Sequence, residues 1–143
     1  MRVEWLILAD FAQVVGNKLY LQGGGWDTLT VNSGFPVDQL CGIAVSVLVP
    51  WNATNERHSF EIEVVTGDGA KVANIGGQFE VGRPPGILAG QDQRWQFAGN
   101  IGLRFDRDGT YKIIARLDGD DAAQSAFRVI PGPLLRAQRE PDL

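Results

Sequence analysis

The stretch WQFAGNIGLRFDRDGTYKIIARLDGDD, residues 95–121, decides the fold class because its apolar residues recur at every second position. Such alternation is typical of strands with one buried face. The two apolar faces consist of Ile101, Leu103 and Phe105 before a turn at 106–109, and of Tyr111, Ile113, Ala115 and Leu117 after it. A second turn at 118–124 leads into a third strand, in which Phe127 and Val129 point inward. The pattern predicts a meander of three strands that pair in sequence.

The same alternation continues upstream. Phe60, Ile62 and Val64 alternate with polar residues before a GDG turn at 67–69, which predicts a hairpin. The stretch CGIAVSVLV, 41–49, is apolar on both faces and rich in β-branched residues, as expected of a central strand covered on both sides.

The N-terminal segment leaves two interpretations open. Residues 3–15 can be read as a helix or as a strand, and the turn signal at Gly16-Asn17 favours a hairpin of two strands. The whole pattern predicts an all-β, immunoglobulin-like antiparallel β-sandwich of eight or nine strands over residues 1–130. Residues 131–143 depart from the alternation and are predicted to form a tail or a short helix docked through Leu134 and Leu135.

Composition excludes several classes of function. The 143 residues carry a formal net charge of −4, with scattered basic residues, so nucleic acid and anionic membranes are not expected partners. No apolar run is long enough to span a bilayer, and a cytoplasmic location is expected. Cys41 is the only cysteine, which excludes an internal disulfide, and we expect a buried, inert thiol. No cofactor is expected.

The sequence also resembles a known family. The segments that carry the resemblance are LADFAQVVGNKLYLQGGGWDTL, FDRDGTYKIIARLDGD and AFRVI, and it covers most of residues 3–130. The chain is similar to a family of uncharacterised bacterial proteins with a domain of unknown function. This resemblance implies a β-sandwich and no known activity or catalytic residue.

Three consecutive glycines at 23–25 raise the question of a phosphate-binding loop. Such a loop needs a Lys followed by Ser or Thr and then a helix, whereas GGGWDTLTV has no Lys and runs into a strand pattern. The glycines therefore predict a bend in a strand. Trp26 is expected to cover the core beside the bend, where its indole N–H needs a partner.

Acidic residues and the single histidine are the candidates for chemistry. The turns contain Asp106, Asp108, Asp118, Asp120 and Asp121, which suggest either a cation site or ordinary Asp-Gly turns, and turns are favoured because neither stretch completes a calcium loop. His58 is predicted to be solvated or hydrogen-bonded, since no second histidine exists for a metal site.

Asp10 lies among apolar residues, and a structural hydrogen-bonding role is favoured over a catalytic one. We therefore predict no catalytic residue and no metal ligand, and expect that the protein is not an enzyme.

The expected working surface is the loop at 83–93, where Ile87 and Leu88 either fold back over the core or meet a partner. The predicted function is a non-catalytic protein-interaction or structural module that self-associates or binds a protein. Two alternative functions remain. One is a small-ligand or carbohydrate module that uses Trp26 and Trp51, the two tryptophans next to turns. The other is an enzyme that uses the carboxylates.

Overall fold

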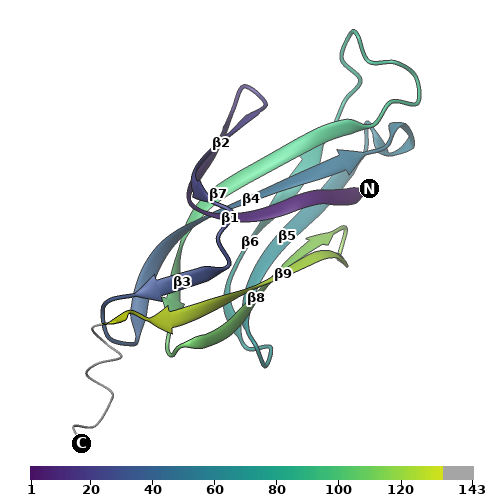
Figure 1. Cartoon of the computed structure of the whole chain (residues 1–143). Coiled ribbons are helices and arrows are strands. Elements are labelled where there is room, and N and C mark those ends of the chain that lie inside the picture. Colours follow the sequence, from purple (N-terminus) through teal and green to yellow (C-terminus); the bar gives the residue numbers. More distant parts are fainter. Residues whose placement is uncertain (134–143) are drawn as a thin grey trace, which may run out of the picture.

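The computed structural model describes residues 1–133, which form a β-sandwich of nine strands in two sheets (Figure 1). The strands are β1 (Arg2–Val15), β2 (Lys18–Gly24), β3 (Thr28–Val31), β4 (Val37–Val49), β5 (Arg57–Thr66), β6 (Lys71–Glu80), β7 (Gln93–Phe105), β8 (Gly109–Leu117) and β9 (Asp120–Pro131). The predicted all-β class and strand number are confirmed. In the described part of the chain, no helix has the length and apolar character needed to cross a membrane.

The two sheets have the strand orders β2-β1-β4-β7 and β3-β9-β8-β5-β6. All neighbouring strands are antiparallel except β3 and β9, which are parallel, so the prediction of a wholly antiparallel sandwich is wrong at this pair. The reason is that Leu29 pairs with Val129, and alternation within a strand does not indicate a partner so distant in sequence.

The predicted meander over 95–130 is also wrong in part. β8 and β9 form the expected hairpin, but β7 pairs with β4 along its whole length in the other sheet. The turn at 106–108 therefore carries the chain from one sheet to the other. Both arrangements turn one apolar face toward the same interior, so the spacing of Leu103 and Phe105 fits either one.

The N-terminal hairpin is confirmed, and the helical interpretation of residues 3–15 is excluded. Gly16 and Asn17 have φ values of 57° and 62°, the left-handed conformation of a two-residue hairpin turn, and Val15 pairs with Lys18. β1 changes partners along its length, because residues 2–9 pair with β4 and residues 9–15 pair with β2.

The part of this hairpin nearest its turn lies against the outer face of the first sheet. The Asn100 side chain on β7 accepts a hydrogen bond from the Ala12 N–H at 3.0 Å and donates one to the Ala12 carbonyl at 2.8 Å, so it serves Ala12 as a neighbouring strand would. Gly42 on β4 leaves the space for this approach, since a Cβ there would lie 2.8 Å from the Ala12 nitrogen. Gln96 adds a bond to the Asn17 carbonyl.

The three glycines form the predicted bend. Gly23 and Gly25 have φ values of 58° and 84°, β2 ends at Gly24, and the Gly25 N–H donates to the Leu8 carbonyl. The chain then enters β3 in the second sheet, so the bend connects the two sheets.

β4 is the central strand that its composition predicts. It lies between β1 and β7, and residues 41–47 are buried on both faces. On the outer face, the buried Ser46 donates to Glu4, whose carboxylate also holds Arg94 at 2.7 Å through two bonds. β4 ends at Val49, directly before Pro50.

The core lies between the two sheets, and the predicted inward residues of β5, β8 and β9 are all buried in it. Trp95 packs against this core and stacks on Phe79 with ring centroids 3.9 Å apart. Trp5 is half-buried and lies outside the core cluster. β9 runs to Pro131, one residue past the predicted end of the sandwich, and the docking predicted for Leu134 and Leu135 lies outside the described residues.

Candidate functional site

The loop from residue 81 to residue 92 joins β6 to β7 and projects from one end of the sandwich (Figure 1). Hydrogen bonds fix its backbone: Leu88 N–H donates to the Gln91 side chain, Gln91 N–H donates to the Leu88 carbonyl, and Ile87 N–H donates to the Pro84 carbonyl. The two predicted binding residues separate, because Ile87 is half-buried whereas Leu88 is 74% exposed. Leu88 is the large apolar side chain that this loop exposes to solvent.

The base of the loop is attached to the connection between β4 and β5. The guanidinium of Arg83 lies 3.7 Å from the centre of the Trp51 ring, and its N–H groups donate to the Thr54 hydroxyl and the Trp51 carbonyl. Gln93 adds a bond to the Gly82 carbonyl at 2.6 Å. One face of Trp51 is therefore occupied by the chain itself.

Trp26 is half-buried and packs against the core, as expected from its place beside the bend. The Trp26 ring packs edge-on against Phe127, with ring centroids 6.1 Å apart, as expected of a residue that covers the core. The indole nitrogen is buried and has no hydrogen-bond partner within residues 1–133. Since Trp26 and Trp51 lie in different connections and pack on different side chains, they do not form a stacking platform for a flat ligand.

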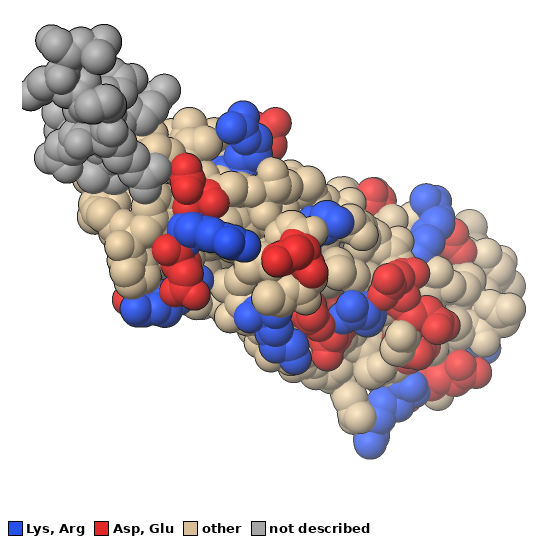
Figure 2. All heavy atoms as spheres, turned by 90° about the horizontal axis from the view of Figure 1, so that it is seen from below, with Lys and Arg blue, Asp and Glu red and all other residues tan. Residues whose placement is uncertain are grey.

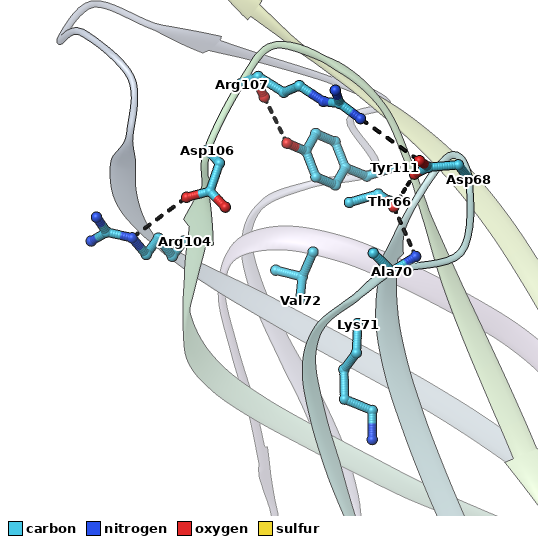
Figure 3. A pocket seen from close by; sticks show the side chains of 9 residues that line it. All are labelled: Thr66, Asp68, Ala70, Lys71, Val72, Arg104, Asp106, Arg107 and Tyr111. Carbon is cyan, nitrogen blue, oxygen red and sulfur yellow. Dashed lines mark hydrogen bonds and ion pairs between the residues drawn. The ribbon is translucent and has the colours of Figure 1, made fainter.

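A pocket lies where the turn after β5 meets the turn after β7 (Figure 3). Its walls consist of Thr66, Asp68, Ala70, Lys71, Val72, Arg104, Asp106, Arg107 and Tyr111. Arg107 is 3.8 Å from Asp68, and Arg104 is 3.6 Å from Asp106. The hydrogen bond from Thr66, together with Arg107, lowers the pKa of Asp68, and a carboxyl with a lowered pKa is a weaker general base.

Two other turn acids, Asp118 and Asp121, also have partners. Asp121 accepts from Arg116 at 2.8 Å, and the same guanidinium binds Glu61 and Glu63 at 2.7 and 2.9 Å. Asp118 and Gly119 both have positive φ, which fits the predicted turn role of an Asp-Gly pair. Among the residues described, no three His, Cys, Asp or Glu side chains gather closely enough to hold a metal ion.

Asp10 and Cys41 are the remaining reactive side chains named by the sequence. Asp10 is exposed on β1, with its carboxylate beside Gly23, so water can solvate this carboxylate although its neighbours in the sequence are apolar. Cys41 is buried as predicted, and burial raises the pKa of its thiol to about 11. The thiolate that would act as a nucleophile is therefore not formed at neutral pH.

His58 is buried and makes two hydrogen bonds. Its Nε2 is 2.7 Å from the Ala53 carbonyl oxygen, and its Nδ1 is 2.9 Å from Asp118 Oδ2. Both partners accept hydrogen bonds, so both are satisfied only when the imidazole carries two protons. Asp118 Oδ1 also accepts the Ser59 N–H, which attaches the β8–β9 turn to the start of β5.

Folding shifts the pKa values of His58 and Asp118 in opposite directions. Burial alone would lower the pKa of His58, but the bond to Ala53 and the bond and charge of Asp118 outweigh it and raise the pKa above 6.5. The Ser59 N–H and then His58 lower the pKa of Asp118 below 3.8, against the effect of burial.

The pair is expected to stabilise the fold most between about pH 3.8 and 6.5. The contribution of His58 is complete below its ordinary pKa of 6.5 and is lost as the pH rises through the raised folded value. The contribution of Asp118 is present above 3.8 and is lost as the pH falls through its lowered folded value. Urea unfolding of the wild type and of His58→Gln between pH 3 and pH 9 measures this, and the difference in unfolding free energy should narrow on both sides of the window. A difference that stays constant from acid to alkaline pH contradicts the imidazolium assignment.

Charges of both signs are interspersed on the face of the molecule seen in Figure 2. This face offers no broad area of one sign for a phosphate backbone.

A sequence profile of a family of unknown function, DUF6941, matches residues 4–130. The chain belongs to this family. No curated protein sequence matches it. The membership confirms the resemblance to a family of unknown function.

Two features of this DUF6941 chain were missed by the sequence reasoning. The bond between His58 and Asp118 joins residues far apart in the chain, and only the pairing of β5 with β8 brings them together. The other feature is the free edge of β6, whose signal was present as a run without charge or proline at 72–79.

Proposed function

We propose that the protein is a non-catalytic interaction module that binds a protein partner, a second copy included, through the loop at 81–92. The observation that carries the proposal is the exposure of Leu88, 74%, on a loop whose backbone is held by its own hydrogen bonds. An apolar side chain in such a position is typical of an anchor that enters a pocket of a partner.

The rigidity of the loop supports this role. A loop that is already ordered loses little conformational entropy on binding, and burial of a leucine side chain contributes about 1.5–3 kcal/mol. Arg83 and Gln93 hold the two ends of the loop, so the position of Leu88 is defined relative to the sandwich.

The proposal also covers catalysis and cellular location. The pairing of Asp68 and Asp106 with arginines, and the burial of Cys41, favour a protein without catalytic activity. A buried, free cysteine as the only cysteine of the chain favours the reducing cytoplasm as its location.

Replacement of Leu88 by serine is expected to weaken partner capture about tenfold or more while leaving the melting temperature within about 2 °C of the wild type. The cause is loss of the anchor from an exposed position that contributes little to the core. Quantitative pull-down from the native host, with light scattering of the purified chain, measures the effect. Leu40→Ser is the matched control, since Leu40 is 59% exposed on β4 and not in the loop. Equal capture and scattering by wild type and Leu88→Ser would refute the proposal.

A further inference from the structure

The outer edge of β6 is long and largely unprotected. β6 is the last strand of the second sheet, and one of its sides pairs with β5. Within residues 1–133, no backbone hydrogen bond outside that ladder involves residues 72–80. Soluble proteins protect such edges with charges, prolines or very short strands, but residues 72–79 contain neither charge nor proline, whereas β3, the opposite edge, has only four residues. An edge of this kind is a template for another strand.

The two ends of β6 carry opposite charges that form no ion pair within residues 1–133. Lys71 and Glu80 are exposed, and no ion pair joins either of them to another described side chain. Lys71 also points away from the ion pairs of the neighbouring pocket (Figure 3).

A bulge at Val72 places both charges on the same face. Val64 pairs with Ala73, but Val65 pairs with Lys71, so β6 contains one extra residue at Val72. As a result, Lys71 lies on the outer face of the sheet together with Glu80. The outer face between them consists of Asn74, Gly76 and Gln78, all exposed.

We propose that β6 pairs with β6 of a second copy of this chain, antiparallel and about a two-fold axis at Gly76. Antiparallel pairing about such an axis keeps the outer faces of both copies on one side, so residues that face each other must share a face. Centred on Gly76, the pairing sets Asn74 opposite Gln78 of the second copy, twice. It also sets Glu80 opposite the bulge at Val72, beside Lys71 of the second copy.

This register gives partners to the groups on β6 that have none in a single copy, namely the outer backbone edge and the charges of Lys71 and Glu80. Glycine places no side chain on the axis, the two amide pairs can exchange hydrogen bonds, and each end joins opposite charges. The edges become the centre of one continuous sheet. The proposal goes beyond the function assigned to the loop and does not rest on Leu88.

β7, the other long edge, is a poorer candidate. A symmetric antiparallel pairing along its full length is centred on Gly99 and sets Arg94 against Arg104 of the second copy, which places like charges opposite each other. Its outer face already holds the β1–β2 hairpin through Asn100 and Gln96.

Sedimentation of the whole chain from about 5 to about 500 µM tests the proposal, since a contact along one strand is expected to be small and concentration-dependent. We expect a dimer of the wild type, a dissociation constant roughly 10- to 50-fold weaker in Lys71→Glu and in Glu80→Lys, and recovery in the double variant that exchanges the two charges. Lys18→Glu, on the edge strand β2, is the matched control and should dimerise as the wild type does. Hydrogen exchange at residues 73–80 should slow as the concentration rises.

A chain that stays monomeric throughout this range overturns the proposal, as does a dimer that both single charge reversals leave unchanged. If Leu88→Ser is the only variant that dissociates the dimer, the dimer contact lies in the loop, which refutes pairing through β6 and supports the proposed function. If the charge variants dissociate the dimer and Leu88→Ser affects neither dimerisation nor partner capture, pairing through β6 is supported and the function proposed for the loop is refuted. Melting temperatures of all variants report whether the fold is intact.

Discussion

The Gly42→Val variant is expected to lose about 2–5 kcal/mol of unfolding free energy and to release the β1–β2 hairpin from the first sheet. A Cβ at position 42 would lie 2.8 Å from the Ala12 nitrogen and 2.9 Å from the Phe11 carbonyl carbon. Both are backbone atoms, so no flexible side chain can move aside. The hairpin must lift, and the two bonds between Asn100 and Ala12 are then lost.

Urea unfolding measures the loss of stability, and limited proteolysis near Asn17 reports the release of the hairpin. Gly102→Ala is the matched control, because Gly102 lies on the adjacent strand β7 and a Cβ there meets nothing within 4 Å. A Gly42→Val protein as stable as this control, with a protease-resistant hairpin, would show that the close contact on the outer face is not needed.

A loss of roughly 2 kcal/mol is the expected result of Asp118→Ala. The substitution removes the acceptor of the Ser59 N–H, leaves buried His58 without its Nδ1 partner and places alanine at a φ of 50°. The expected loss of unfolding free energy is smaller than the sum of these effects because the Asp118 side chain is 45% exposed. Water therefore replaces part of the hydrogen bonding that this side chain provides.

Asp118→Asn separates the causes. Asparagine tolerates positive φ and retains an oxygen for the Ser59 N–H, so it should lose less than half as much as alanine. Thermal and urea unfolding at a pH between 4 and 6 compares the two variants where the His58 charge is present. Equal losses would mean that the ion pair, and not the turn, accounts for the whole contribution.

Alternation was sufficient to predict the strands because each buried face repeats at every second residue within one local segment. Phe60, Ile62 and Val64 are buried as their spacing indicates, and the Gly16-Asn17 turn decides between helix and hairpin at the N-terminus. The partners of the strands were less predictable. The alternation of β7 is the same whether it pairs with β8 or, as observed, with β4.

The candidate site was predicted in part. The loop at 83–93 was recognised from its Pro-Gly composition, but the sequence does not reveal that Gln91 turns Leu88 outward while Ile87 packs inward. Trp26 covers the core as its place beside the bend indicates, because this turn carries the chain to the other sheet and brings the ring against Phe127.

The place of β9 has a consequence for biosynthesis. β9 lies between β3 and β8, so the second sheet is interrupted until the last strand is inserted. β3 leaves the ribosome well before its parallel partner β9, because Leu29 pairs with Val129, which is made much later. β3 can join the second sheet only after translation has passed β9, and until then the apolar face of β3 lacks its native partner.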